Sequence, residues 1–152
     1  MGWHSLVSVS IKRAVQWNKK LFVSKNYTYN CNCSRKELSE NETGFNGPIY
    51  NGLCRSKAIN QDNSLRVILT ETFIEFIDRI QGHQSCDLER DVGDFIVWRR
   101  DNIISYHLAT VIDDNDKRIN NVVRGFDLIR PTFCQLYLQN LLGFESPEYS
   151  HI

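Results

Sequence analysis

The clearest pattern along the chain is an apolar period of about 3.6 residues, which occurs near both ends. Between residues 10 and 24 this period is carried by Ile11, Ala14, Val15, Leu21 and Phe22. Between residues 127 and 142 it is carried by Phe133, Leu136, Tyr137 and Leu141, and Gly143 follows where a helix stop is expected. Glycine is favoured just after the last turn of a helix. The pattern therefore predicts helices over residues 10–24 and 127–142.

Stretches rich in β-branched and aromatic residues predict strands in the middle of the chain. These stretches are residues 27–29, 64–72, 73–80 with a strand at 73–78, 94–99 and 121–125. We expect a loop over residues 82–90, which are polar and begin with glycine. Residues 103–112 are apolar enough for either a strand or a buried helix. The acidic run at 113–116 is expected to end that element.

Strands alternate with helices in this order, which predicts an α/β fold with a mostly parallel sheet. The run at 94–99 is almost continuously apolar, as a central strand covered on both faces requires. Ligands of such sheets bind beyond the carboxyl ends of the strands. Arg124 stands at the carboxyl end of one predicted strand, where a guanidinium can bind a carboxylate through two hydrogen bonds. The alternative is a surface arginine, or one paired with Asp127 or Asp113.

Tyr106 lies in the apolar run 103–112, and a buried phenol needs a hydrogen-bond partner. It is therefore either a core tyrosine with an internal hydrogen bond, which its surroundings in the sequence favour, or a donor in a pocket. His107 and His151 are isolated, and the sequence contains no visible arrangement of a catalytic nucleophile with its base. A Gly-rich phosphate loop following a strand is also not visible.

Cysteines in the first third of the chain form the most chemically specific pattern, Cys-Asn-Cys at 31–33 followed by Tyr-Asn-Gly-Leu-Cys at 50–54. A Cys-x-Cys pair lets two thiolates approach one ion, and a returning loop must supply the other ligands of a tetrahedral site. Turn residues at 44–48 allow such a return. The spacing favours zinc, although it is less diagnostic than two Cys-x-x-Cys motifs. The alternative is free core thiols and an ordinary loop tyrosine.

Composition narrows the class of protein without identifying it. A chain of 152 residues can bury roughly 70% of the surface that its unfolded form exposes. Lysine plus arginine equals aspartate plus glutamate at 18 each, so the net charge indicates neither nucleic acid nor membrane. No apolar run approaches the ~20 residues of a membrane span, and the start does not resemble a signal peptide. The five cysteines favour reduced thiols and metal ligands over disulfides, and we expect a cytoplasmic protein.

Six stretches together resemble the glutamyl-queuosine tRNA(Asp) synthetases, a bacterial family related to the catalytic half of glutamyl-tRNA synthetase. They are residues 29–35, 49–55, 93–101, 106–114, 122–129 and 147–151, in this order. The combination of Cys-x-Cys with Tyr-x-x-x-Cys separates this family from ordinary glutamyl-tRNA synthetases. The similarity extends from residue 26 to the last residue.

The resemblance implies the catalytic domain of a class I aminoacyl-tRNA synthetase, with a Rossmann-like α/β sheet and a zinc-binding knuckle inserted at residues 29–58. Members of the family activate L-glutamate with ATP and transfer it to queuosine in tRNA(Asp). Carried over by position, the zinc ligands are Cys31, Cys33, Tyr50 and Cys54. Tyr106 and Arg124 are the implied glutamate-binding residues, and the remaining cysteines, Cys86 and Cys134, are spare thiols.

Two motifs with which the family binds ATP do not occur in these 152 residues. One is a HIGH-like segment in a strand-to-helix turn, and the other is a KMSKS-like loop with its lysine. Because the chemistry depends on stabilising phosphate charge, we expect residues 1–152 to be a partial catalytic domain that is impaired or inactive alone and has no catalytic residue of its own. A complementary fragment could supply the rest. The alternatives are a non-catalytic zinc-containing tRNA-binding module and an inert remnant of the enzyme.

Overall fold

The computed structural model describes residues 19–59 and 63–152. Residues 19–24 are helical, as predicted, and the rest of the helix predicted at 10–24 lies outside the described residues. Phe22 is fully buried, and its ring packs edge-on against Trp98 with 5.5 Å between the centroids. This aromatic contact fixes the helical turn to the core.

The first sheet has three strands in the order β1 (Thr28–Cys31), β4 (Ser64–Val67) and β7 (Ile96–Trp98). Both pairings in this sheet are antiparallel. Val67, Val97 and Trp98 are buried, which explains the apolar character of these stretches. The strands predicted around 27–29 and 94–99 are therefore confirmed, and in the stretch 64–72 the strand is confined to residues 64–67.

The expectation of a mostly parallel sheet is wrong for the described part of the chain, where the one parallel pair of strands is β8 (Asn121–Arg124) with β9 (Glu148–His151). Their register places Arg124 opposite His151. A helix, α5 (Ile129–Leu142), connects the two strands, as parallel pairing requires. A continuous apolar run shows that both faces of a strand are covered, but it carries no information about the direction of the neighbouring strand.

Helix α5 follows a 3₁₀ turn, η1 (Phe126–Leu128), and its C-cap Gly143 has the left-handed φ of 70° that suits glycine. The helix predicted at 127–142 is thus confirmed. Residues 103–112 contribute to a helix, α4 (Tyr106–Asp116), which Ser105 caps by accepting a hydrogen bond from the Leu108 amide. The acidic run at 113–116 does not end this helix, because its side chains are exposed or half-buried and keep their hydration.

The prediction of a loop over residues 82–90 is also wrong. Strand β6 (Gly82–Asp87) pairs with β5 (Phe73–Asp78) in an antiparallel hairpin, and a short helix, α3 (Leu88–Asp91), follows. Most side chains of β6 are exposed or half-buried, so its sequence has no apolar alternation that would indicate a strand. Strand β5 was visible because its sequence is rich in phenylalanine and isoleucine.

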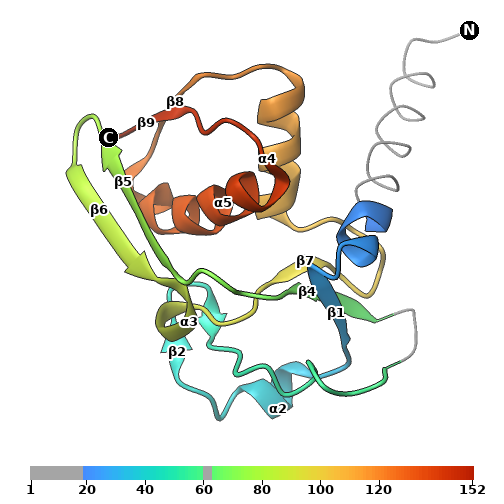
Figure 1. Ribbon diagram of the computed structural model, residues 1–152. Helices are drawn as coiled ribbons and strands as arrows, with labels where there is room; N and C mark the ends of the chain where they lie inside the picture. The colour runs from blue at the N-terminus through green and yellow to red at the C-terminus, as the bar shows by residue number, and fades with distance from the viewer. Residues whose placement is uncertain (1–18, 60–62) are drawn as a thin grey trace, which may run out of the picture.

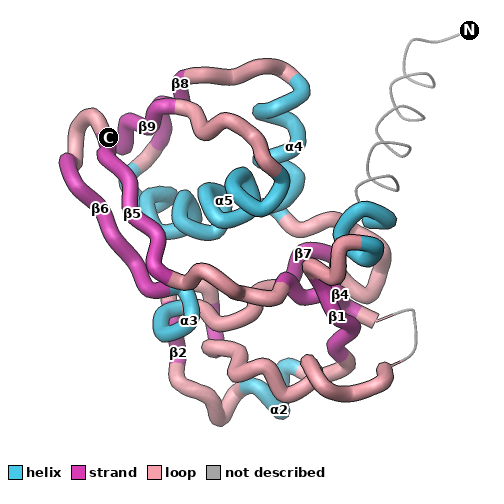
Figure 2. The backbone as a smooth tube through the Cα atoms, viewed as in Figure 1, coloured by secondary structure: helices cyan, strands magenta, loops and turns pink. Residues whose placement is uncertain are grey.

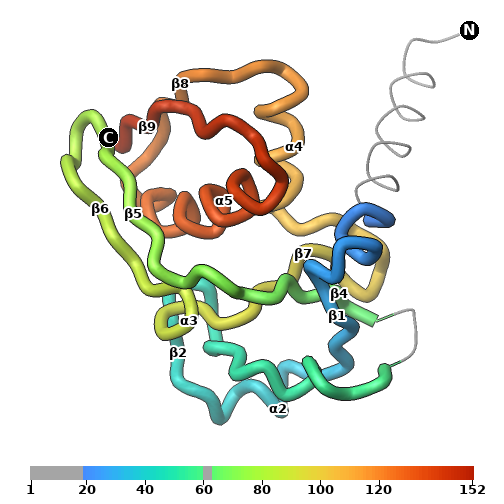
Figure 3. Tube along the Cα trace, viewed as in Figure 1, coloured from blue at the N-terminus to red at the C-terminus, as the bar shows by residue number. Residues whose placement is uncertain are grey.

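The elements form two halves that share one core (Figure 1). In the upper half, α4 and α5 lie beside β8 and β9. In the lower half, the β1-β4-β7 sheet carries the segment of chain that connects β1 to β4. This segment contains α2 (Arg35–Leu38), β2 (Thr43–Gly44) and β3 (Gly47–Pro48). The β5–β6 hairpin runs along one side and joins the halves (Figures 2 and 3). Buried residues of both halves form the core, including Leu65, Val97, Leu108, Phe133 and Leu138. In the described part, no helix is long and apolar enough to cross a membrane.

Candidate functional site

The segment between β1 and β4 returns the chain to the end of β1. Cys31 is the last residue of β1, and the β2–β3 pair then reverses the chain, with Gly47 at a φ of 100°. Tyr50 next forms a β-bridge with Gly93. A Cβ at Gly93 would lie 2.1 Å from the Tyr50 carbonyl oxygen, so only glycine permits this close approach.

All four sequence-predicted zinc ligands come together in one cluster, defined here as Cys31, Cys33, Tyr50 and Cys54. The three sulfurs lie within 4.8 Å of one another, and those of Cys33 and Cys54 are 3.5 Å apart. The Tyr50 phenol oxygen is 3.4 Å from Sγ of Cys31 and 3.5 Å from Sγ of Cys33. All three cysteines are free thiols, and only Cys33 is appreciably exposed.

The spacing of this cluster fits a tetrahedral metal site. Bond lengths of about 2.3 Å to sulfur and about 2.0 Å to oxygen would separate two sulfurs by about 3.8 Å, and a sulfur from an oxygen by about 3.5 Å. The sulfur–oxygen distances of 3.4 and 3.5 Å agree with this geometry, and the 3.5 Å between two sulfurs is slightly short of it. The cluster could therefore hold one metal ion.

Arg66 in β4 is the charged neighbour of the cluster. Its Nε donates a hydrogen bond to Sγ of Cys31 at 3.2 Å, and its guanidinium stacks on the Tyr50 ring. Burial raises the pKa of the Cys31 thiol, but its hydrogen bonds with Tyr50 and Arg66 outweigh burial and lower that pKa. Burial, with the contact to Cys54, raises the pKa of Cys33 to about 11. Cys31 is thus converted more readily than Cys33 to the thiolate, the form that binds metals.

A buried carboxylate fixes the cluster to the rest of the fold. Asp94 accepts two hydrogen bonds from Arg55, at 2.6 and 2.5 Å, and one from the Tyr29 hydroxyl at 2.6 Å. Its side chain is fully buried, so the charge requires these partners. Because Arg55 directly follows Cys54, the ion pair also holds the last cysteine in place.

Arg124 lies at the carboxyl end of β8, as predicted, but its partners differ from both alternatives. Nε donates to Nε2 of His151 at 3.1 Å, and Nη2 donates to Thr132 at 2.6 Å and to Gln135 at 2.8 Å. The residue is half-buried, and within the described residues it pairs with neither of the two aspartates considered above. Nε and Nη2 are thus engaged in hydrogen bonds within the protein, so a ligand carboxylate would bind to Nη1.

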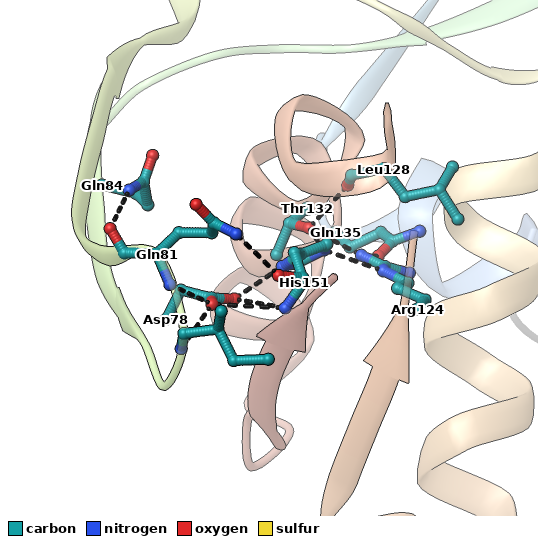
Figure 4. Close-up of polar contacts among 9 residues, drawn as sticks. Asp78, Gln81, Gln84, Arg124, Leu128, Thr132, Gln135 and His151 are labelled. Carbon is teal, nitrogen blue, oxygen red and sulfur yellow. Dashed lines mark hydrogen bonds and ion pairs between the residues drawn. The ribbon is translucent and has the colours of Figure 1, made fainter. Parts of the chain in front are cut away.

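Two buried residues that the sequence did not connect support this arrangement (Figure 4). Nδ1 of His151 lies 2.6 Å from Oδ2 of Asp78, and both side chains are fully buried. Burial raises the pKa of the Asp78 carboxyl, but hydrogen bonds from the Gln81 amide, His151 and the Ile80 amide outweigh burial and lower the pKa to about 2. Asp78 and His151 are 73 positions apart. The sequence offered one signal, the place of His151 within the last stretch of family resemblance.

Tyr106 opens α4 and is 54% exposed, which excludes the core-tyrosine alternative. It lines a cavity of about 460 Å³ together with Arg66, Arg99 and His107. Burial and the charge of Arg124 lower the pKa of His107 to about 4, so Arg124 lies close enough to act on the residue next to Tyr106. No hydrogen bond or ring contact joins Tyr106 to Arg124 in the described part of the chain, and their common pocket stays a prediction.

Two solved structures share this fold. A glutamate tRNA ligase from Elizabethkingia meningosepticum, in complex with its amino acid, superposes with a TM-score of 0.75 at 20% identity. The match covers 94% of this chain and 33% of the ligase chain. The glutamate-tRNA synthetase from Elizabethkingia anophelis superposes with a TM-score of 0.72 at 21% identity and the same coverage. The fold is that of a class I aminoacyl-tRNA synthetase catalytic domain, as the sequence predicts.

The sequence comparison assigns the family. Residues 10–152 match the model for tRNA synthetases class I (E and Q), catalytic domain, and the chain belongs to this family. It is 46% identical over 125 residues to the Glutamyl-Q tRNA(Asp) synthetase of Pseudomonas putida (strain GB-1), and 45% identical to that of Pseudomonas aeruginosa PAO1. Each match covers 82% of this chain and 41% of the relative, so the chain spans about two fifths of the length of these proteins. The resemblance found in the sequence is confirmed.

Proposed function

We propose that this chain is part of a glutamyl-Q tRNA(Asp) synthetase, which activates L-glutamate with ATP and transfers it to queuosine in tRNA(Asp). The observation that carries the proposal is the identity of 45–46% over 125 residues to proteins of that name. The proposed substrates ATP and tRNA are cytoplasmic molecules, which supports a cytoplasmic location.

Arg124 and Tyr106 are the proposed glutamate-binding residues. A half-buried guanidinium with two N–H groups on Nη1 suits one carboxylate of the substrate. The exposed phenol of Tyr106 can orient the substrate by hydrogen bonding, since its hydroxyl both donates and accepts. His107, buried and neutral beside them, adds no competing charge.

The proposed metal is one zinc ion held by Cys31, Cys33, Tyr50 and Cys54. Three thiolates and one oxygen complete a tetrahedron and leave no open position, so the ion would have a structural role. It would hold residues 29–58 together as the inserted knuckle. Support comes from the spacing of the cluster and from the chemistry of its donors.

ATP and tRNA(Asp) are the further substrates in this proposal. Because these 152 residues contain neither a HIGH-like nor a KMSKS-like motif, we expect them to bind glutamate but to form glutamyl-adenylate slowly or not at all by themselves. A complementary fragment that carries those motifs would then restore the reaction. ATP–pyrophosphate exchange in the presence of glutamate measures this step. A rate comparable to that of a full-length relative would contradict the expected impairment.

Glutamate binding can be measured by calorimetry on the 152-residue chain. Arg124→Gln should weaken binding at least about tenfold, because a charged hydrogen bond is lost. Arg90→Gln, the same change at an exposed position in α3, should leave affinity unchanged. If the chain binds no glutamate but binds tRNA(Asp) at physiological salt, the alternative of a zinc-containing tRNA-binding module is favoured. If it binds neither, the inert-remnant alternative is favoured.

A further inference from the structure

We infer that Asp78 is a positioning residue of the amino-acid site, which acts through His151 to fix the guanidinium of Arg124 with Nη1 free for the ligand carboxylate. The inference rests on the proposed function, because it assigns Arg124 to the carboxylate of glutamate. Figure 4 shows the three side chains in line, with Asp78 at the end of β5, His151 in β9 and Arg124 at the end of β8.

The direction of each hydrogen bond follows from which groups can donate. Arginine only donates, so Nε2 of His151, 3.1 Å from Nε of Arg124, is the acceptor and carries no proton. The imidazole proton then lies on Nδ1, which donates to Oδ2 of Asp78 at 2.6 Å. An ionised carboxylate only accepts, so Asp78 selects this tautomer of His151.

The other partners of Arg124 agree with this assignment. The Thr132 hydroxyl donates to the Leu128 carbonyl oxygen at 2.8 Å, so it accepts from Nη2 of Arg124 at 2.6 Å. Gln135 Oε1 accepts from the same nitrogen at 2.8 Å. Nε and Nη2 thereby use three of the five N–H groups of a guanidinium, and the two on Nη1 have no hydrogen-bond partner within the described residues. The framework therefore leaves one end of Arg124 for a ligand.

Because the surrounding side chains are buried, the tautomer of His151 affects the free energy of this site. The side chains of Asp78 and His151 are fully buried, and Thr132 and Gln135 are exposed by at most 1%. If His151 carried its proton on Nε2, that N–H would face the Nε–H of Arg124, and the one nearby acceptor, the Thr132 hydroxyl oxygen 3.1 Å from Nε2, already accepts from Nη2 of Arg124. Two opposed donors among buried side chains cost free energy, and the guanidinium would have to turn away.

Asp78 also has a structural task, which the test must separate from positioning. Its carboxylate accepts hydrogen bonds from the backbone amides of Ile80, Gln81 and His151. Asp78→Asn keeps the shape and one oxygen for these amides but places an N–H donor near the imidazole. This substitution therefore changes the selection of the tautomer more than it changes packing.

The test uses the 152-residue chain with ¹⁵N-labelled histidine and arginine. In the wild type, NMR should find His151 protonated on Nδ1 and bare on Nε2 at neutral pH, with the Arg124 Nε–H protected from exchange. In Asp78→Asn, the Nε2–H tautomer should be populated, the Arg124 protection should be lost, and glutamate should bind about tenfold more weakly. Glu75→Gln, the same kind of change at an exposed position of β5, should leave all three unchanged.

Each outcome separates the inference from the proposed function. A wild-type His151 protonated on Nε2 overturns the inference without any variant, so the test holds even if Asp78→Asn does not fold. Equal glutamate affinity for wild type and folded Asp78→Asn overturns it as well, while the proposed function stands. If the wild type binds no glutamate but Asp78→Asn still switches the tautomer and exposes Arg124, the proposed function fails and the positioning of Arg124 by Asp78 is supported.

Discussion

The guanidinium of Arg66 lies 3.7 Å above the centre of the Tyr50 ring while its Nε donates to Sγ of Cys31 at 3.2 Å. One side chain thus contacts two of the four proposed metal ligands. Its Nη1 also donates to the Asp94 carbonyl oxygen at 2.6 Å. Because a buried cation requires such partners, Arg66 ties strand β4 to the cluster.

Replacing Arg66 by lysine should destabilise the fold by about 1–3 kcal/mol, because an ammonium cannot stack flat on a ring and reach two acceptors at the same time. Urea denaturation followed by tryptophan fluorescence measures the change. Arg99→Lys, at an exposed arginine paired with Asp101, should cost less than about 1 kcal/mol. Equal losses for the two variants would contradict the role given to Arg66.

Replacing Cys54 by serine should reduce the zinc content from about one ion per chain to near zero, since a tetrahedral site with three thiolates loses one of them. Tyr50→Phe keeps the thiolates and should weaken zinc binding without abolishing it. Elemental analysis and competition with a chelator measure both effects. Cys134→Ala removes a buried thiol outside the cluster and should not change the zinc content. Full zinc retention by Cys54→Ser would rule out the proposed ligand set.

His107 should make the fold less stable in mild acid. Burial and the charge of Arg124 lower its pKa from 6.5 to about 4 in the folded chain. Between these two values the unfolded chain binds a proton that the folded chain does not, so the free energy of unfolding falls as the pH drops from 6.5 to 4. Above this window the contribution of His107 is constant.

Urea midpoints measured across that window should therefore decline less in His107→Gln than in the wild type. His83→Gln changes an exposed histidine and should reproduce the wild-type slope. The difference between the two profiles isolates the buried imidazole from carboxylates that titrate in the same range. An unchanged slope in His107→Gln would show that His107 is not kept neutral by the fold.

Gly93→Ala should destabilise the chain by more than about 2 kcal/mol. The residue has a φ of 71°, and the added Cβ would lie 2.1 Å from the carbonyl oxygen of Tyr50. Gly82→Ala is the matched control, because Gly82 has a φ of 74° but no atom within 4 Å of the added Cβ. It should cost only about 1 kcal/mol for the strained backbone. Thermal denaturation distinguishes the two, and equal losses would mean that the contact with Tyr50 is unimportant.

Local patterns predicted the elements of the fold better than their pairing. Strand β5 and helix α5 could be located because apolar side chains recur at the right spacing and a glycine marks the helix end. Strand β6 could not, because its hydrogen bonds with β5 form although most of its side chains face water. The antiparallel orientation of β7 comes from its pairing with β4, which lies about thirty residues earlier. An apolar run does not indicate the direction of the neighbouring strand.

In the candidate site, too, local features could be predicted from the sequence and long-range contacts could not. The cluster could be predicted because its four residues lie between positions 31 and 54 and have types that bind metals. Asp78 and His151 are 73 positions apart and have ordinary local surroundings, so their pairing depends on the hairpin reaching β9. Arg124 was placed correctly at a strand end, but its neutral partners on α5 became visible only with the fold.

Because of the register of β8 against β9, the surroundings of Arg124 depend on the length of the connection between α5 and β9. Arg124 lies opposite His151, and successive side chains of a strand point to opposite faces, so a shift of one residue would turn the imidazole away from the guanidinium. Residues 143–147 connect α5 to β9 and act as a spacer whose length decides which side chain meets Arg124. If Arg124 binds glutamate as proposed, a single insertion or deletion there should weaken binding as effectively as a substitution of Arg124, although none of these residues is proposed to touch the substrate.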